Sequence, residues 1–354
     1  MLQPLAPGAP AAPVGRPVVG ITLGDYNGVG PELILQLLAE PHLAQLAQLV
    51  VYASSTFFAS YRRHFALADE QPFTLVNELP ENANANANAS DNDRKPILVH
   101  CWDDDFAFTP GQPSATAGQA AFLSLRRATA DLAAGRLHAM VTAPINKATM
   151  PAGFGAQGHT DYLARHLGNG KSLMLMASDT LRVAVATDHV PLAAVPILLT
   201  RELLQDKLDM LSATLRQDFA CAMPKIAVLA LNPHAGEGGK MGTEEASMIG
   251  PLIRRNQERL PTLVGPLPAD GFFGRHLYRR FDAVLALYHD QGLIPFKALA
   301  GDEGVNFTAG LPHIRTSPAH GTAYDIAGRG IASVSSFRQA LYMAVDVHRR
   351  RSTS

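Results

Sequence analysis

Residues 18–38 read VVGITLGDYNGVGPELILQLL, a β-branched run followed by a glycine-rich turn and a helical pattern. The opening run predicts a buried strand, and Pro31 falls in the first helical turn, where proline is well tolerated. Gly28 and Gly30 nearly match a dinucleotide fingerprint, but Leu33 stands where the third glycine would be. The segment predicts a strand, a turn and a helix. The turn is either a tight structural turn or an anion-binding loop at the helix N-terminus.

The same alternation of strand and helix continues along the chain. Further strands are expected at residues 49–53, 97–100, 139–142, 173–176, 183–186, 226–231 and 283–288. Helical patterns alternate with them at residues 31–48, 117–135, 200–217, 243–259 and 336–349. This alternation is typical of a mostly parallel sheet with helices on its faces. The sequence therefore predicts the α/β class.

The composition excludes several classes of protein. The 354 residues carry 30 Lys+Arg against 31 Asp+Glu, with 47% hydrophobic residues. The length suggests about two domains or one large α/β unit. A near-neutral charge lacks the basic excess of nucleic-acid binders, and the longest apolar runs, such as residues 190–200, are too short to span a membrane. We expect neither nucleic acid nor membrane as a partner.

Two segments and two cysteines bear on the compartment and on possible metal sites. Residues 1–16 form an Ala/Pro/Gly-rich stretch without the features of a signal peptide, so we expect a flexible leader on a cytoplasmic protein. Residues 81–93 read ENANANANASDND and predict a low-complexity surface loop. Cys101 and Cys221 are the only cysteines, so a metal site would have to use histidines and carboxylates.

Three histidines each follow a predicted strand, at His189, His234 and His289. A single histidine at a strand end is more often a hydrogen-bonded cap than a ligand. Three at equivalent positions converge if their strands are neighbours, and three imidazoles that leave one position open are typical of catalytic zinc. Neutral imidazole also suits cobalt, nickel or iron, so this pattern does not choose the metal.

Other polar residues allow two interpretations. Lys297 and Arg315 are either ordinary surface cations or a binding site for an anionic substrate, with arginine as a forked donor. Thr160 is the expected N-cap of a helix over residues 161–166, with His159 exposed before it, and this is compatible with a phosphate-binding site at that helix N-terminus.

Several longer motifs resemble known enzymes. HGTAYDIAGRGIA at residues 320–332 is similar to the nucleotide-binding loop of isopropylmalate and isocitrate dehydrogenases, which bind NAD(P) without a Rossmann fingerprint. The histidine set instead resembles the 4-hydroxythreonine-4-phosphate dehydrogenase family of vitamin B6 synthesis. The matching stretches are GHTD (158–161), LNPHAGEGGKMGTEE (231–245), YHDQGL (288–293) and GVNFTAGLPHIRTSPAHGTA (304–323).

This resemblance implies a role for individual residues. It implies metal ligands at His189, His234 and His289, and one divalent ion per site, either zinc, magnesium or cobalt. It implies substrate-binding residues at His159, Thr160, Lys297, Asn306 and Arg315. It also implies contacts to NAD or NADP at His320, Gly321, Thr322, Ala323 and Asp325.

The resemblance also implies an architecture and an assembly. It implies an isocitrate/isopropylmalate dehydrogenase-like fold with two α/β lobes around a cleft. The first lobe, on the cofactor side, is expected at residues 17–140 plus 300–354, and the second, with the metal ligands and the dimer contacts, at residues 141–299. The family forms a homodimer whose active site mixes residues of both subunits, so the three histidines need not come from one chain.

The implied substrate is a small phosphorylated anion. The family oxidises the C3 hydroxyl of 4-phosphooxy-L-threonine with NAD or NADP, and loss of CO2 then gives 3-amino-2-oxopropyl phosphate. A histidine-bound cation suits this chemistry as a Lewis acid. Asp270 and Asp290 are candidates for proton transfer or for orienting the ligands, and Lys147 and Lys297 for positioning anionic groups or protonating the enolate.

Three alternatives remain at the level of the sequence. The same scaffold also suits a phosphorylated threonate-like acid or the cis-dihydrodiol of an aromatic dicarboxylate as substrate. A metal hydrolase with three histidine ligands is a second alternative, against which the loop at residues 320–332 argues. A non-catalytic sensor is disfavoured, because every matched position keeps a residue of the expected type.

Overall fold

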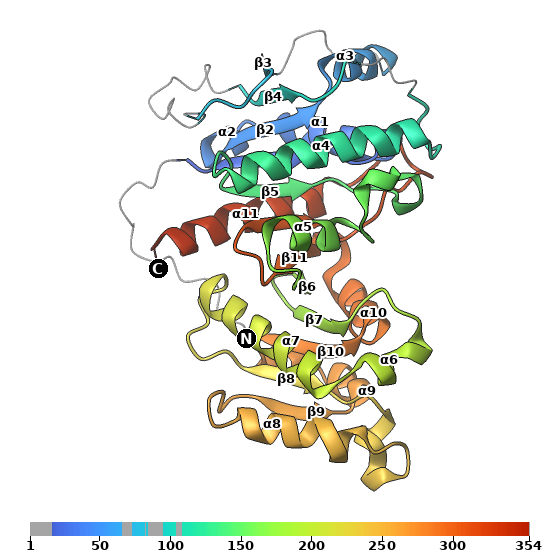
Figure 1. Cartoon of the computed structure of the whole chain (residues 1–354), viewed down its shortest axis with the longest axis vertical. Coiled ribbons are helices and arrows are strands. Elements are labelled where there is room, and N and C mark those ends of the chain that lie inside the picture. Colours follow the sequence, from blue (N-terminus) through green and yellow to red (C-terminus); the bar gives the residue numbers. More distant parts are fainter. Residues whose placement is uncertain (1–15, 66–72, 82, 84–94, 104–107, 354) are drawn as a thin grey trace. The chain divides into compact units, whose positions relative to one another are not determined.

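The computed structural model in Figure 1 describes residues 16–65, 73–81, 83, 95–103 and 108–353. The chain divides into two compact units. The larger unit runs to Lys171 and resumes at Leu311, and the smaller unit comprises Ser172–Gly310. Of the expected leader and loop, only Arg16, Glu81 and Ala83 lie within the described residues.

The larger unit is built on six strands that pair in parallel in the order β3-β4-β2-β1-β5-β12. The strands are β1 (Val18–Thr22), β2 (Gln48–Ala53), β3 (Thr74–Val76), β4 (Ile97–His100), β5 (Ala139–Thr142) and β12 (Ile314–Pro318). The helices are α1 (Gly30–Leu38), α2 (Leu43–Leu46), α3 (Ser55–His64), α4 (Ala115–Ala133), η3 (Lys147–Thr149), η4 (Ala152–Phe154), α5 (His159–Leu167) and α11 (Ser335–Thr353). Helix α4 packs on β1 and β2, and α11 packs on β5 and β12.

The smaller unit has its own six strands, in the order β11-β6-β7-β10-β8-β9. They are β6 (Leu173–Ala177), β7 (Arg182–Thr187), β8 (Ile226–Leu229), β9 (Val264–Leu267), β10 (Ala283–Tyr288) and β11 (Val305–Ala309). The helical elements are η5 (Leu192–Ala194), α6 (Val195–Leu198), α7 (Arg201–Gln217), η6 (Pro233–Gly239), η7 (Glu245–Ile249), α8 (Gly250–Asn256), α9 (Ala269–Gly274), η8 (Leu277–Arg280), α10 (His289–Ala300) and η9 (Gly301–Glu303). Only the pairings of β6 with β7 and with β11 are antiparallel among these described strands. The predicted α/β class with a mostly parallel sheet is confirmed.

The prediction of one helix over residues 31–48 is wrong for the second half of that range. Helix α1 ends at Leu38, shortly before Glu40, the residue that precedes Pro41. Strand β2 already begins at Gln48. The residue before a proline is disfavoured in the helical conformation, which explains the early end. The apolar residues that follow pack in the short helix α2 and in β2 instead.

The unit boundaries lie at residues 171/172 and 310/311, whereas the sequence placed them at 140/141 and 299/300. The segment that follows β5 stays with the larger unit because its aromatic side chains pack on α4. The rings of Phe154 and Tyr162 stack at 5.3 Å, and both meet the edge of Phe122 at about 6 Å. All three belong to one buried core, which therefore fixes α5 against α4.

No helix among the described residues is long and apolar enough to cross a membrane. Neither Cys101 nor Cys221 forms a disulfide bond within the described residues.

Candidate functional site

The strands that precede the three histidines are neighbours, as their convergence requires. Strand β10 pairs in parallel with β7 on one side and with β8 on the other. Thr187 and Tyr288, the last residues of β7 and β10, lie opposite each other. The ring centroids of His189 and His289, which follow these strands, lie 5.5 Å apart. The sheet order thus brings two of the three histidines together.

Asp290 orients one histidine of this pair. The Nδ1 atom of His289 lies 2.7 Å from Oδ1 of Asp290, so the carboxylate accepts a hydrogen bond from that ring nitrogen. A histidine held by a carboxylate through one nitrogen presents the other to a metal, and such partners fix the tautomer and the ring orientation. The His189–His289 pair therefore fits two positions of an imidazole metal site.

His234 lies in an unusual backbone segment. Residues 234–238 all have positive φ, and three of them, His234, Ala235 and Glu237, are not glycine. Left-handed residues other than glycine cost of the order of 1–3 kcal/mol each, so the surroundings must hold them. His234 is exposed, and no group of three potential metal ligands forms within the part of one chain that the structure describes.

Glu245 holds the start of this left-handed segment, and sequence reasoning did not single it out. Its Oε1 atom accepts hydrogen bonds from the backbone N–H groups of Leu231 and Asn232, each at 2.8 Å. Its Oε2 atom accepts from the Asn232 amide at 3.0 Å. The buried carboxylate thus anchors the turn that presents His234. The adjacent acidic pair in LNPHAGEGGKMGTEE is the only sequence signal for it.

The other candidates of the smaller unit are more dispersed. Asp270 is exposed in the first turn of α9, and Lys297 is exposed on α10. Asn306 lies on β11, and its Oδ1 atom is buried with no hydrogen-bond partner among the described residues. An unpartnered buried acceptor is costly, so this oxygen is suited to accept a hydrogen bond from a bound ligand.

The larger unit buries a cation beside β5. Arg315 on β12 is 2% exposed, and its Nε and Nη2 atoms donate to Oγ1 of Thr142 at 3.1 and 2.6 Å. Burial lowers the pKa of Arg315 to about 9. The guanidinium remains charged at neutral pH, and a charge held in such a place favours an anionic ligand.

His159 lies next to this arginine and is neutral. Burial and the charges of Arg315 and Lys147 hold the pKa of His159 well below its ordinary value. Its Nε2 atom is buried with no hydrogen-bond partner among the described residues. Lys147 is exposed, and its side chain passes next to Gly158, where a Cβ would lie 3.1 Å from Cε of Lys147. Arg315, Lys147 and His159 together form what we call the cation cluster.

The expected capping role of Thr160 is wrong, as is the exposed position of His159. Helix α5 already begins at His159, its N-cap is Gly158, and no side chain caps it. The next acidic residue, Asp161, accepts a hydrogen bond from the backbone N–H of Gln157. Phe154 and Tyr162, which flank the helix start, pack on Phe122 of α4, and His159 is half-buried and lies within the electrostatic influence of Arg315.

The backbone of residues 27–29, in the glycine-rich turn that follows β1, is hydrogen-bonded within the protein. Its N–H groups are already engaged, because Asn27 donates to Oδ1 of Asp25, Gly28 to the Asp25 carbonyl and Val29 to the Thr322 carbonyl. A Cβ at Gly28 would lie 2.6 Å from that same Thr322 oxygen, so only glycine fits there. The N–H groups of residues 27–29 are therefore not available to bind an anion. The alternative of an anion-binding loop is excluded for these three residues.

Tyr324 joins this turn to the loop at residues 320–332. Its hydroxyl donates to Oδ2 of Asp25 at 2.7 Å, and Asp25 is 1% exposed. Burial raises the pKa of Asp25 despite this hydrogen bond. The neighbouring Ala323 has a φ of 46°, so the loop is held in a strained conformation at the residues expected to contact the cofactor.

In the same loop, Nδ1 of His320 lies 2.9 Å from the carbonyl oxygen of Gly321, while Asp325 is exposed.

A mostly parallel α/β scaffold that buries the charge of Arg315 belongs to the class of α/β proteins suited to bind a small anion. The family model described as pyridoxal phosphate biosynthetic protein PdxA matches residues 45–344. The chain belongs to this family, which confirms the resemblance stated from its motifs.

Several relatives and solved structures carry the name 4-hydroxythreonine-4-phosphate dehydrogenase. The 4-hydroxythreonine-4-phosphate dehydrogenase of Bacteroides thetaiotaomicron is 46% identical over 335 residues, covering 94% of this chain and 89% of the relative. The crystal structure of the enzyme of the same name from Klebsiella pneumoniae superposes with a TM-score of 0.77 at 32% identity, covering 94% and 98% of the two chains. A terephthalate 1,2-cis-dihydrodiol dehydrogenase from Burkholderia xenovorans gives a TM-score of 0.60 at 25% identity, with the same coverage. The expectation of a nicotinamide-dependent oxidoreductase is thus confirmed at the level of the family.

The neutral state of His159 predicts a pH dependence of stability. Below the ordinary histidine pKa of 6.5 the unfolded chain protonates His159, whereas the folded chain does not. The unfolding free energy therefore falls as the pH drops below 6.5, by about 1.4 kcal/mol per pH unit from this residue. In urea denaturation, His159→Gln should lack this contribution, and the exposed His64→Gln should behave as the wild type. A stability difference between wild type and His159→Gln that stays constant with pH would contradict the assignment.

The hydrogen bond between Tyr324 and Asp25 predicts a selective effect on cofactor binding. Tyr324→Phe should raise KM for the nicotinamide cofactor roughly fivefold, the effect of one lost hydrogen bond, with little change in kcat. Tyr26→Phe is the matched control, because its hydroxyl is also on this turn but bonds to Thr116. Equal KM values for both variants would count against a positioning role for Tyr324.

Proposed function

We propose that this chain oxidises the C3 hydroxyl of 4-phosphooxy-L-threonine, which is 4-hydroxythreonine 4-phosphate, with NAD or NADP. The 3-oxo acid then loses CO2 to give 3-amino-2-oxopropyl phosphate. The observation that carries the proposal is the cation cluster of Arg315, Lys147 and His159 in a member of a family whose relatives carry this activity in their name. A cytoplasmic location follows for an enzyme that uses these soluble metabolites.

The cation cluster binds the anionic groups of the substrate. Thr142 fixes the guanidinium of Arg315, which can then offer forked donors to a phosphate or carboxylate. Lys147 adds a mobile positive charge from the exposed side. The neutral His159 donates a single hydrogen bond to an oxygen of the anionic ligand through its buried Nε2 atom. Thr160, Lys297 and Asn306 are proposed as further substrate contacts, and the Oδ1 atom of Asn306 accepts from a substrate donor.

His189 and His289 are proposed ligands of one divalent cation, either zinc, magnesium or cobalt. Their 5.5 Å ring separation and the hydrogen bond between His289 and Asp290 support this role. When bound, the cation polarises the substrate hydroxyl and stabilises the negative charge that develops on its oxygen. His234 is the proposed third ligand. Because one chain does not bring it to the other two, we propose a homodimer in which the partner subunit completes the site.

The remaining roles concern protons and the cofactor. Asp290 orients His289, and Asp270 and Lys147 are proposed to move protons at the substrate hydroxyl and at the enolate carbon left after CO2 departs. The loop residues His320, Gly321, Thr322, Ala323 and Asp325 are proposed to contact NAD or NADP. The hydrogen bond between Tyr324 and Asp25 holds this loop in place before the cofactor binds.

A second substrate class has one observation in its favour. The structural likeness to a terephthalate 1,2-cis-dihydrodiol dehydrogenase favours an aromatic-dicarboxylate dihydrodiol as the alternative. Such a substrate also presents a vicinal hydroxyl and carboxylates to the cation cluster. It needs no phosphate-binding site, however, and the identity to the 4-hydroxythreonine-4-phosphate dehydrogenases is higher.

Steady-state kinetics test this proposal. NADH or NADPH formation with 4-phosphooxy-L-threonine should disappear after chelation and return when one divalent metal is restored. His289→Ala should lose metal and turnover together, and Asp290→Asn should weaken metal affinity by roughly 10–100-fold, while the exposed His64→Ala changes neither. Turnover that survives exhaustive chelation would overturn the metal site. Turnover of the dihydrodiol alone would overturn the substrate.

A further inference from the structure

The turn that carries Lys147 lies beside the turn that follows β1. Strands β1 and β5 pair in parallel, so both turns leave the sheet at the same edge. The backbone N–H of Asp25 donates to the Pro144 carbonyl at 2.8 Å. A Cβ at Gly24, whose φ is 68°, would lie 2.4 Å from that same carbonyl oxygen. The two turns are therefore in direct backbone contact, and a side chain at position 24 would separate them.

A chain of side-chain hydrogen bonds joins this contact to the loop at residues 320–332. The hydroxyl of Tyr324 donates to Oδ2 of Asp25 at 2.7 Å. Burial raises the pKa of Tyr324, and a hydrogen bond with the Asn146 side chain acts in the opposite direction. Because Tyr324 gives its single hydroxyl proton to Asp25, the amide nitrogen of Asn146 donates to the tyrosine oxygen. The chain thus runs in one direction, from Asn146 through Tyr324 to Asp25.

Asn146 also holds the turn that presents Lys147. It is the N-cap of η3, and its Oδ1 atom accepts from the backbone N–H of Ala148 at 3.0 Å. Its carbonyl oxygen accepts from Oγ1 of Thr149, also at 3.0 Å. The turn packs closely on α4, since a Cβ at Gly118 would lie 1.8 Å from the Thr149 carbonyl oxygen. The position of this turn determines from where the charge of Lys147 approaches an anion in the cation cluster.

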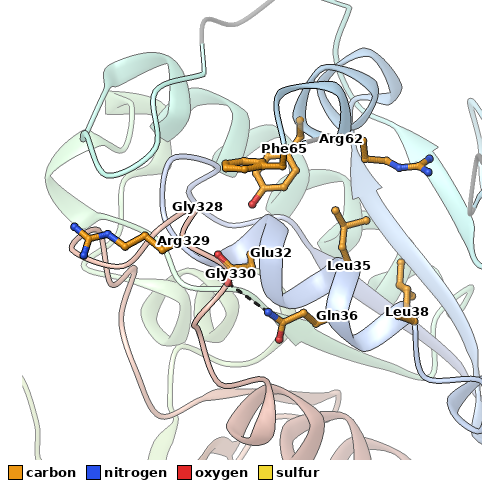
Figure 2. Close-up of a pocket in the computed structure, with 11 residues that line it drawn as sticks. Glu32, Leu35, Gln36, Leu38, Arg62, Phe65, Gly328, Arg329 and Gly330 are labelled. Carbon is orange, nitrogen blue, oxygen red and sulfur yellow. Dashed lines mark hydrogen bonds between the residues drawn. The ribbon is translucent and has the colours of Figure 1, made fainter. Parts of the chain in front are cut away.

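The far end of the loop is anchored separately. In Figure 2, residues 328–330 lie beside Glu32 of α1, and all of them line one pocket. The Oε1 atom of Glu32 accepts from the backbone N–H of Ala332 at 3.2 Å and from Nε2 of Gln36 at 3.3 Å. With this end held on α1, a rearrangement in the first half of the loop acts on Tyr324.

The proposed cofactor contacts flank Tyr324 on both sides, at Ala323 and Asp325. Ala323 has a φ of 46°, which is a strained conformation for a residue other than glycine. A cofactor that orders these residues also orders the Tyr324 hydroxyl and, through Asn146, the turn of Lys147. When one ligand has ordered a shared element, the second ligand loses less entropy on binding, which gives positive cooperativity without a large structural change.

We propose that the Asn146–Tyr324–Asp25 chain makes the nicotinamide cofactor and the anionic substrate bind cooperatively, with Asn146 and Tyr324 as positioning residues for Lys147. This inference rests on the proposed function, because it takes the cofactor loop and the cation cluster as the two binding sites. Each ligand raises the affinity for the other by the same factor, as thermodynamic linkage requires. This factor is about fivefold, the effect of one hydrogen bond.

Calorimetric titration of the full chain with 4-phosphooxy-L-threonine, with and without saturating NADH or NADPH, measures this factor. A reduced dinucleotide cannot accept a hydride, so the ternary complex does not turn over. In the wild type, the dissociation constant of the substrate should fall about fivefold when the dinucleotide is present. Titration of the dinucleotide with and without the substrate should give the same factor.

Two variants interrupt the chain at different points. Asn146→Ser keeps a side chain that can cap η3 but loses the donor to Tyr324. It should bind the dinucleotide alone as the wild type does, while the factor falls to about one. Tyr324→Phe should weaken binding of the dinucleotide alone and also reduce the factor to about one. Tyr26→Phe is the matched control, because its hydroxyl bonds to Thr116, and it should keep the wild-type factor.

A wild type that binds the substrate equally well with and without either reduced dinucleotide would overturn the inference. A folded Tyr324→Phe or Asn146→Ser variant that keeps the wild-type factor would overturn it as well, and Tyr324→Phe decides alone if Asn146→Ser fails to fold. Both results leave the proposed function standing if turnover of 4-phosphooxy-L-threonine persists. Conversely, cooperative binding without oxidation of that substrate would refute the proposed function and keep the link between the two sites.

Discussion

The larger unit has to accommodate the buried positive charge of Arg315, whose side chain is 2% exposed, and the arrangement around it follows from this requirement. Arg315 can be buried only because β12 lies beside β5 and brings Thr142 within hydrogen-bond reach. Its charge then holds His159 neutral, and the packing of α5 on α4 keeps that histidine in place. A buried positive charge held by a neutral hydroxyl favours an anion, so the fold itself defines a substrate of negative charge.

The regular part of this structure is predictable from local sequence, because β-branched runs and helical periodicity are local properties. The strands at 139–142 and 283–288 occur at the expected residues, and the neighbouring order of β7, β10 and β8 explains why His189 and His289 meet. Short strands such as β3 and β9 give no such signal, so local patterns do not predict them. A helix near residues 161–166 is predicted, but its place in the fold is not. The place of α5 depends on aromatic packing against α4, which its own sequence does not specify.

The least predictable features join residues that are distant in sequence. The hydrogen bond between Tyr324 and Asp25, the contact of Ala332 with Glu32 and the anchoring of the His234 turn by Glu245 all depend on the folded backbone. Each fixes a loop that follows a strand, which is where α/β proteins place their ligands. The sequence therefore predicts candidate residues for the chemistry, whereas the structure identifies the side chains that hold their loops.

We infer that Arg315 recognises the anionic substrate through a forked, fixed guanidinium. Calorimetric titration of 4-phosphooxy-L-threonine into the wild type and Arg315→Lys, with the exposed Arg126→Lys as control, tests it most directly. Lysine keeps the charge but loses the paired donors, so we expect affinity to fall by at least about tenfold in Arg315→Lys and to stay unchanged in Arg126→Lys. An Arg315→Lys variant that folds and binds the substrate as tightly as the wild type would contradict the account.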